Sequence, residues 1–220
     1  MRAVFGRTVA VVTVVALLIG CAAGPAAAAG RAPAKVVKTA LVMVRPVTST
    51  SRLQKGFAVG AVAHGASCLA GSEVLDRAYR CFASKGAIHD PCWAYVDPAR
   101  PSEKDAACLD EPWDRKVVVL AGATGLVPTS GARTIVRSLP WGLALANGEK
   151  CVLAQGAHDQ FDGRVVDYTC GTGYSLVVLR GLDQRHALWR ARTAHYTHGH
   201  YVPAGLTTIT TAWYALPAPA

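Results

Sequence analysis

Residues 143–154, Leu-Ala-Leu-Ala-Asn-Gly-Glu-Lys-Cys-Val-Leu-Ala, decide the fold class of this chain. Two mainly apolar runs flank Asn147-Gly148, and an Asn-Gly pair in this setting is the strongest short-range signal for a β-hairpin with a type I′ turn. Further runs with strand-like composition follow at 164–170, 174–180, 187–196 and 206–214, and most are separated by Gly, Asp or Pro. We therefore expect an antiparallel meander that forms a small barrel or a sandwich.

The half of the chain before this hairpin has less regular patterning. Residues 36–44 and 116–120 are predicted strands, because they are apolar and rich in β-branched side chains. The segment 65–114 contains three acid-Pro pairs, which are typical of turns, and helical periodicity is nearly absent from the chain. These features predict a mostly β protein with an irregular, disulfide-stapled N-terminal half.

Six cysteines downstream of the N-terminal region fit a set of three disulfides. Pairing in chain order would enclose short loops, but six cysteines allow 15 pairings and the sequence does not choose among them. A thiol metal site is less favoured, because no Cys-x-x-Cys spacing occurs. The six are Cys68, Cys81, Cys92, Cys108, Cys151 and Cys170.

The first thirty residues have the composition of an export signal. Arg2 and Arg7 precede an uncharged, mostly apolar run at 9–19 that is too short to cross a bilayer. Two processing sites compete, a lipobox that ends at Cys21 and would make it a lipidated N-terminus, and a small-residue site before Gly30. We expect a signal peptide over 1–29, or 1–20 for a lipoprotein. We expect the signal to be followed by a tether with a first strand over 30–60. A single disulfide-bonded β domain would then extend over 61–216.

Composition narrows the function classes. The 220 residues are 51% hydrophobic and 17% charged, which excludes a disordered chain. No second long apolar run follows the signal, so we expect an extracellular protein or a cell-membrane lipoprotein, with a lipid as its only membrane anchor. The net charge of +9 would draw an exported protein to an anionic envelope polymer, but scattered basic residues also serve simple solubility. The expected partner is an anionic envelope polymer or another exported protein. A nucleic-acid partner is not expected, because there is no Lys/Arg run or recognition helix.

Three histidines are the candidate metal ligands: His195, His198 and His200. Neutral imidazoles bind Zn²⁺ or Cu²⁺ when three or four ligands converge, and a turn at Gly199 would bring these three together. The alternative is a solvated hairpin tip. A metal-dependent secreted hydrolase is therefore a second hypothesis for the function, although no cofactor is predicted for the main one.

The candidate binding surface is Trp189, Arg190 and Arg192. On a strand the two arginines would share the face opposite Trp189, which gives a basic stripe over an aromatic core. Tryptophan and arginine are enriched at binding hot spots, and no residue set is predicted to be catalytic. A serine hydrolase is not favoured, because the residues around Ser175 lack the final glycine of the nucleophile-elbow motif. A glycosidase pair of carboxylates is not favoured either, because Asp159, Asp162 and Asp167 are also the residues that turns require.

A set of short motifs over about residues 60–214 resembles a family of exported actinobacterial proteins. The resemblance implies a disulfide pattern and a location, as lipoproteins or extracellular parts of envelope proteins, and no established activity. Its motifs are Ser67-Cys68, Gly71-Ser72, Ala78-Tyr79-Arg80-Cys81, Asp90-Pro91-Cys92, Pro112-Trp113, Pro140-Trp141, Asn147-Gly148, Cys151, Tyr168-x-Cys170 and Thr211-Ala212-Trp213.

A second resemblance covers residues 168–173, Tyr-Thr-Cys-Gly-Thr-Gly, followed by a predicted strand. This segment is similar to the signature of exported lysozyme inhibitors, which are disulfide-bonded β-barrels. It implies a loop that plugs the active site of a wall hydrolase. The main hypothesis remains an exported, non-catalytic envelope-binding module, with a lysozyme-inhibitor-like protein as an alternative.

Overall fold

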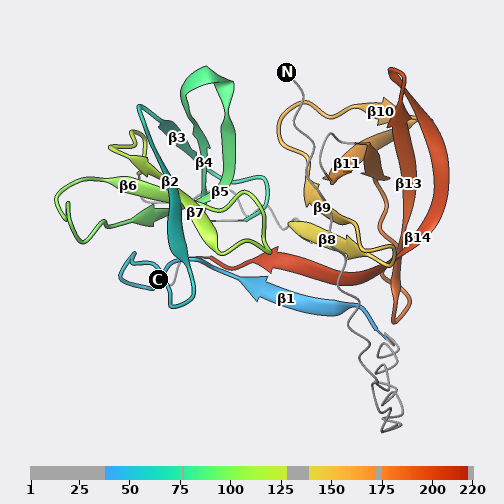
Figure 1. Cartoon of the computed structure of the whole chain (residues 1–220), viewed down its shortest axis with the longest axis horizontal. Coiled ribbons are helices and arrows are strands. Elements are labelled where there is room, and N and C mark those ends of the chain that lie inside the picture. The colour runs from blue at the N-terminus through green and yellow to red at the C-terminus, as the bar shows by residue number, and fades with distance from the viewer. Residues whose placement is uncertain (1–37, 76, 128–138, 172–174, 218–220) are drawn as a thin grey trace, which may run out of the picture. The chain divides into compact units, whose positions relative to one another are not determined.

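The computed structural model describes residues 38–75, 77–127, 139–171 and 175–217. The chain divides into Met1–Lys35, which lies outside these residues, and one compact unit over Val36–Ala220. The predicted signal segment and Cys21 therefore lie outside the described residues. The described part is mostly β, as expected, with fourteen strands and one 3-10 turn at Ser84–Gly86 (Figure 1). Within it, no helix is long and apolar enough to span a membrane.

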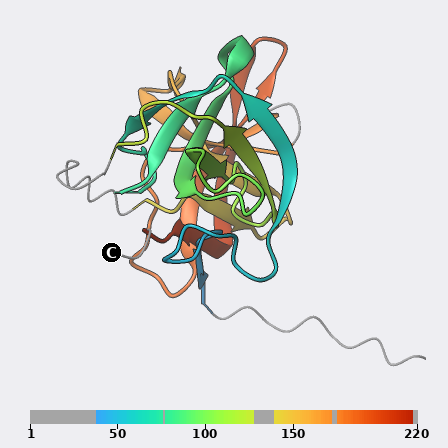
Figure 2. The same cartoon turned by 90° about the vertical axis from the view of Figure 1, so that its left-hand side faces the viewer.

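The N-terminal sheet has six strands in the order β2-β7-β6-β5-β4-β3 (Figures 1 and 2). Strands β3 to β7 form an antiparallel meander in the half of the chain where irregular structure was expected, whereas β2 pairs with β7 in parallel. The main-chain amide of Thr124 donates to Ala66 and its carbonyl accepts from Cys68, so the chain beyond β7 returns to β3. The strands are β2 (Ala58–His64), β3 (Ser67–Ala70), β4 (Tyr79–Phe82), β5 (Ile88–Tyr95), β6 (Asp105–Cys108) and β7 (Lys116–Ala121).

The C-terminal strands close into a barrel. The ring runs β8-β9-β11-β12-β13-β14 and back to β8, and each neighbouring pair is antiparallel. β1 adds to β14 in parallel, from Ala40 opposite Thr211 to Val44 opposite Ala215, and β10 pairs with β11. The strands are β1 (Ala40–Val44), β8 (Gly142–Leu145), β9 (Lys150–Leu153), β10 (Gln160–Phe161), β11 (Arg164–Cys170), β12 (Leu176–Leu179), β13 (Trp189–Thr197) and β14 (His200–Ala215).

The two sheets share a buried aromatic contact. Trp93 of β5 and Trp141, which immediately precedes β8, are both fully buried, and their ring centroids lie 6.2 Å apart. Val44 and Val47 belong to the same apolar cluster. The indole N–H of Trp93 donates to the carbonyl of Leu216 at 3.1 Å. Burial of these side chains holds the N-terminal sheet against the start and the end of the C-terminal barrel.

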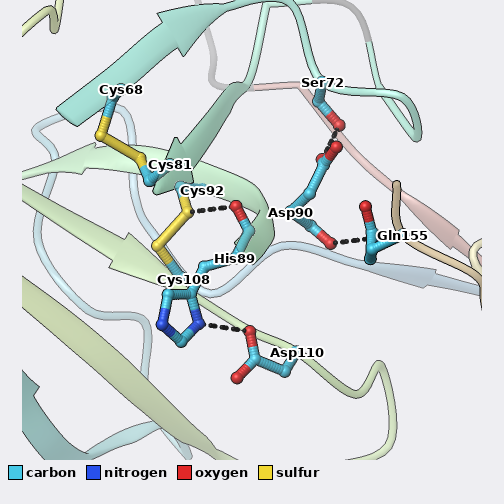
Figure 3. Close-up of a disulfide and its surroundings, with 9 residues drawn as sticks. All are labelled: Cys68, Ser72, Cys81, His89, Asp90, Cys92, Cys108, Asp110 and Gln155. Carbon is cyan, nitrogen blue, oxygen red and sulfur yellow. Dashed lines mark hydrogen bonds and ion pairs between the residues drawn. A yellow bond between two sulfur atoms is a disulfide. The ribbon is translucent and has the colours of Figure 1, made fainter. Parts of the chain in front are cut away.

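The six cysteines form three disulfides in chain order, which is one of the pairings that the sequence allowed. Each bond joins residues directly opposite each other on neighbouring antiparallel strands. Figure 3 shows the first two bonds side by side in the N-terminal sheet. The pairs are Cys68–Cys81, Cys92–Cys108 and Cys151–Cys170.

The hairpin at Asn147-Gly148 forms, but its predicted turn type is wrong. A type I′ turn needs positive φ at both central residues, and only Gly148, at φ 91°, has it. The amide of Gly148 donates to the carbonyl of Leu145, which makes a type I turn followed by a left-handed glycine. His198-Gly199 and Asp162-Gly163 have positive φ at both residues and take the primed geometry instead.

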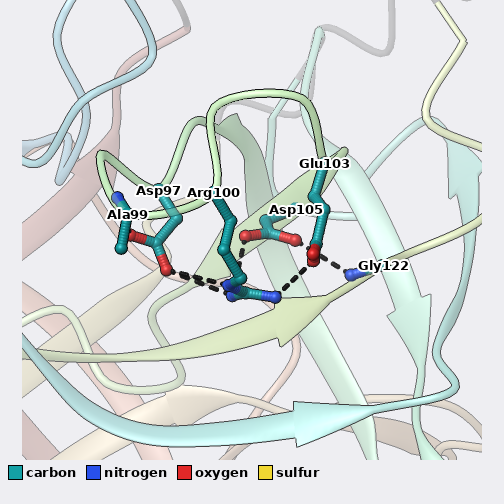
Figure 4. Close-up of polar contacts among 6 residues, drawn as sticks. All are labelled: Asp97, Ala99, Arg100, Glu103, Asp105 and Gly122. Carbon is teal, nitrogen blue, oxygen red and sulfur yellow. Dashed lines mark hydrogen bonds and ion pairs between the residues drawn. The ribbon is translucent and has the colours of Figure 1, made fainter.

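A buried carboxylate fixes the loop between β5 and β6. Asp105 is almost fully buried and accepts a hydrogen bond from the amide of Gly122 at 2.9 Å (Figure 4). The guanidinium of Arg100 donates to Asp105 at 3.2 Å and also contacts Asp97 and Glu103. The arginine therefore neutralises the buried charge and organises the loop around itself.

Candidate functional site

Two adjoining cavities form one groove, which we call the inter-sheet groove. Their volumes are about 640 and 520 Å³, within the range of small-molecule sites. The first cavity borders segments of both sheets, and the second continues over the outer face of the C-terminal barrel. Five residues line both cavities: Ile88, Val152, Leu153, Gln155 and Thr169.

The floor of the groove is made by β9 and β11. Thr169 pairs with Val152 across these strands, and neither residue belongs to the buried core of the barrel. Their neighbours Tyr168 and Cys170 are fully buried, because side chains alternate faces along a strand. The disulfide Cys151–Cys170 joins the next pair of residues along the same ladder. The floor is therefore a rigid surface held by both backbone pairing and a covalent bond.

One wall of the groove comes from β5 and is tied down by a buried carboxylate. Asp90 is 2% exposed, and it accepts a hydrogen bond from the Ser72 hydroxyl (Figure 3). It also accepts one from the Glu73 amide. The side-chain amide of Gln155 donates to the Asp90 carbonyl at 3.2 Å. This last bond links β5 to the segment that follows β9, so it connects the two sheets at the groove.

The acidic end of the groove lies on the connection between β6 and β7. The Asp110 carboxylate is 2.8 Å from Nδ1 of His89, and Glu111 accepts a hydrogen bond from the Trp113 indole at 2.7 Å. The ammonium of Lys150 lies 5.4 Å from the centre of the Trp113 ring, a cation–π distance. Both carboxylates are thus held in place before any ligand arrives.

The tyrosine end of the groove lies on the β13–β14 hairpin. Tyr196 and Tyr201 pair across the hairpin with ring centroids 4.8 Å apart, and Phe161 packs against Tyr201 at 5.8 Å. The Tyr201 hydroxyl donates to Asp159 at 2.7 Å. Burial and this hydrogen bond raise the pKa of Tyr201 to about 12, so the hydroxyl keeps its proton at physiological pH.

The charge of the groove is opposite to that of the chain. Three exposed carboxylates line the two cavities, those of Asp110, Glu111 and Asp159, whereas Asp90 borders the first cavity with its carboxylate buried. Among the described residues, Lys150 is the only lysine or arginine that lines either cavity, although the chain has 23 such residues and a net charge of +9. The groove therefore favours neutral or cationic groups over anionic ones.

We expect the protein to lose stability as the pH rises from about 4 to 7. Burial raises the pKa of Asp90 from 3.8 to about 6, so the folded state binds a proton more tightly than the unfolded state. The stabilisation is complete below pH 4 and is lost as the pH rises through 6, by about 3 kcal/mol. The hydrogen bond to Asp110 raises the pKa of His89, which adds a loss in the same direction above pH 6.5. Urea unfolding at pH 4.5 and 7.0 measures about 2 kcal/mol of the Asp90 loss, and a third measurement at pH 8.5 adds the loss from His89.

The control for this prediction is Asp90→Asn, which removes the titrating carboxyl. In that variant we expect the free energy of unfolding to fall much less between pH 4.5 and 7.0, whatever its absolute value. His89→Gln should keep most of the fall. A wild-type protein that is equally stable, or more stable, at pH 7.0 would contradict the assignment.

The structure separates the three histidines of the predicted metal site. His198 forms the turn with Gly199, while His195 and His200 lie on the strands to either side. Nδ1 of His195 contacts the Ser175 carbonyl, and Nδ1 of His200 contacts the carbonyl of His198. In the described part of the chain, no group of three ligand atoms within 4.8 Å includes these imidazoles. The metal site stays a prediction, and it would require the hairpin tip to rearrange.

The predicted binding surface is divided between two faces of β13. Arg190 and Arg192 are exposed, whereas Trp189 is half-buried and packs against the barrel core, as strand alternation predicts. The Trp189 amide also donates to the Thr39 hydroxyl at 2.9 Å. The arginines therefore form a basic stripe on the outside of the barrel, and Trp189 supports it from within.

Other residues weighed in the sequence have structural contacts. The buried Asp167 pairs with Arg180 at 3.0 Å, and Asp162 occupies a turn at φ 49°. In the lysozyme-inhibitor-like segment, Tyr168 is buried and donates to the Pro140 carbonyl at 2.8 Å. The last two residues of this segment, Thr172 and Gly173, lie outside the described residues. That hypothesis stays a prediction.

A cluster of three sulfur atoms has a structural explanation. The ligand atoms of Cys81, Cys92 and Cys108 lie within 4.8 Å of one another, a spacing that would suit a metal ion. All three cysteines are oxidised in disulfides. Their sulfur atoms are close together because the bonds Cys68–Cys81 and Cys92–Cys108 lie side by side (Figure 3). A disulfide sulfur lacks the thiolate charge that binds zinc, so this cluster belongs to the core.

Sequence reasoning missed the groove itself. Sequence patterns place Trp113 in a short family motif and Asp159 among turn carboxylates, and they single out neither Tyr196 nor Tyr201. The acid-Pro pair Glu111-Pro112 correctly predicts a turn. Nothing in its sequence indicates that this turn lines a groove together with residues of β9. Comparison with known proteins adds no assignment, because no protein-family model, curated protein or solved structure matches this chain.

Proposed function

We propose that this protein is an exported module that binds a cell-envelope polymer, and that the inter-sheet groove is its ligand site. The observation that carries the proposal is the groove, in which two adjoining cavities share a rigid floor and hold polar groups at both ends. Such a shape suits an extended ligand better than a compact one. A wall glycan with its peptide branches has this form.

The polar groups of the groove are already fixed in position, which supports a role in binding. His89 holds Asp110, the Trp113 indole holds Glu111, and the Tyr201 hydroxyl holds Asp159. A preformed set of acceptors lowers the entropy cost of binding, since few side chains need to be ordered by the ligand. The aromatic rings beside them offer flat apolar faces for the rings of sugars.

The location in the proposal rests on two features. The first thirty residues have the pattern of an export signal, and three disulfides are typical of proteins from oxidising compartments. The exposed Arg190 and Arg192 offer a second contact with anionic envelope polymers. This contact would be weakened by salt, whereas contacts within the groove would be less sensitive.

Sedimentation with purified bacterial cell-wall sacculi tests the proposal. The variant Thr169→Trp places a bulky ring on the floor of the groove, on the outer face of the barrel where it leaves the core intact. We expect it to weaken retention by the sacculi about tenfold, which corresponds to about 1.4 kcal/mol. Leu206→Trp is the matched control, because Leu206 is 65% exposed on the same barrel and lines neither cavity.

A third variant separates the groove from the basic stripe. Arg190→Gln with Arg192→Gln should reduce retention at low salt and make little difference at high salt. If this variant loses all retention while Thr169→Trp keeps it, the basic stripe and not the groove is the binding surface. If the wild-type protein is not retained at all, an envelope polymer is not the ligand.

A further inference from the structure

We propose that the tyrosine end of the groove, formed by Tyr196, Tyr201 and Asp159, binds an alkylammonium group. This inference rests on the proposed function, because it takes the groove as the ligand site, and it adds the chemical class of one group on the ligand. Alkylammonium groups include primary amines on aliphatic side chains and quaternary ammonium groups.

Two tyrosine rings form an aromatic corner in the cavity of about 520 Å³. The rings of Tyr196 and Tyr201 are inclined by 52°, and Tyr196 is 44% exposed, so part of its surface is open to a ligand. The face of an aromatic ring carries negative electrostatic potential, which attracts a cation within about 6 Å of the ring centre. Because both tyrosines line the same cavity, one cation there can contact both side chains.

A carboxylate stands beside this corner. Asp159 lines the same cavity and accepts the hydrogen bond of the Tyr201 hydroxyl. The hydroxyl orients the carboxylate without adding a positive charge. Phe161 packs behind Tyr201 at 5.8 Å and holds its ring in place. The corner therefore combines an aromatic surface with one formal negative charge, the combination that selects cations over neutral groups.

The rest of the cavity suits an alkyl-substituted cation. No lysine or arginine lines this cavity in the described ranges of the chain, in contrast to the acidic end, where Lys150 is present. Val152 supplies part-exposed apolar wall surface, and Val166 and Val177, which are almost fully buried, border the cavity with it. Methyl or methylene groups on the nitrogen would contact Val152, whereas an anionic group would meet Asp159. The lining thus favours an alkylammonium ion over a phosphate or a carboxylate.

The test compares choline chloride with 3,3-dimethylbutan-1-ol, its uncharged isostere, at constant ionic strength. Both probes have the same shape, so a difference in affinity reports the positive charge alone. We expect choline to bind about tenfold more tightly than the alcohol. Amide chemical shifts of the full chain, followed by NMR, should move at Tyr196, Tyr201 and Asp159. Equal affinities, or shifts confined to other residues, would overturn the proposal.

Variants of the corner provide the second measurement. Asp159→Asn keeps an acceptor for the Tyr201 hydroxyl but removes the charge, so it should weaken choline binding and leave the alcohol unaffected. Tyr196→Leu should weaken choline binding at least fivefold. Phe82→Leu, at a 38% exposed aromatic residue that lines neither cavity, is the matched control and should have no effect.

The two proposals fail in distinguishable ways. If Thr169→Trp abolishes retention by sacculi but choline and its isostere bind alike, the groove is the polymer site and its tyrosine end does not select cations. If choline binds at Tyr196 while sacculi retain neither wild type nor variants, the cation site stands and the envelope-polymer proposal is wrong.

Discussion

Trp93→Ala is expected to destabilise the protein by about 3–5 kcal/mol, the range for truncating a large buried aromatic side chain. Trp93 has no exposed surface, and its ring packs against Trp141 between the two sheets. The substitution leaves a cavity in this contact and removes the hydrogen bond to the Leu216 carbonyl. Because the free energy of unfolding of a domain is only about 5–15 kcal/mol, this loss is a large fraction of the total stability. Urea unfolding followed by tryptophan fluorescence measures it.

A graded series identifies the source of this effect. Trp93→Phe keeps most of the apolar volume and loses the indole N–H, so we expect a loss of about 1–2 kcal/mol. Trp113→Ala removes a partly exposed ring and should cost less than Trp93→Ala. If Trp93→Ala costs less than 1 kcal/mol, the contact between the sheets does not depend on this pair of tryptophans.

Replacing both Cys151 and Cys170 by alanine is the second large effect, with an expected loss of about 3 kcal/mol. The disulfide spans a sequence separation of 19 residues, and its removal enlarges the unfolded ensemble by the entropy of that loop. The two residues are also buried beneath the groove floor, beside the pair of Thr169 and Val152. We therefore expect retention by cell-wall sacculi to weaken along with stability.

The control is the corresponding double variant of Cys68 and Cys81. That bond spans 13 residues and lies in the N-terminal sheet, where neither cysteine lines the groove. We expect a similar loss of stability, about 3 kcal/mol, without loss of retention under conditions where the protein remains folded. Equal effects of the two variants on retention would show that the groove depends on global stability and not on its own disulfide.

The acidic groove and the basic exterior give the protein two kinds of contact with an envelope. Arg190 and Arg192 face outward, whereas Asp110, Glu111 and Asp159 line the groove. A wall polymer that carries both anionic groups and amines would be attracted to the outside and held in the groove. Salt should therefore slow association more than it accelerates release. Electrostatic steering by the exposed arginines acts over distances that salt screens, whereas contacts within the groove are short-range and less screened.

Local sequence was enough to place most strands of the C-terminal barrel. Apolar and β-branched runs separated by Gly, Asp or Pro located them, because such runs favour strands and such breaks favour turns. The residues 164–170 match β11 without change, and the opposite faces of Trp189 and Arg190 follow from the alternation of side chains along a strand. Six cysteines predicted the disulfides, because paired strands bring such residues within bonding distance.

Tertiary structure alone decided the parallel pairs and the turn types. The paired residues of β1 and β14, such as Ala40 and Thr211, lie 171 positions apart in the chain, and no local pattern encodes such a pairing. The turn at Asn147 took a type I geometry, while His198-Gly199 took the primed one, because the register of each hairpin sets the φ of its turn. That register also separated the three histidines.

The groove is likewise a product of tertiary structure. It combines residues 88–90, 110–113, 150–155 and 196–201, which no spacing rule connects. Each segment has the sequence of an ordinary strand or turn. Nothing in that sequence indicates that the segment lines a ligand site. Strand pairing within the barrel brings the last two segments together, and the packing of the two sheets around Trp93 and Trp141 adds the first two, because burial of those rings fixes how the sheets meet.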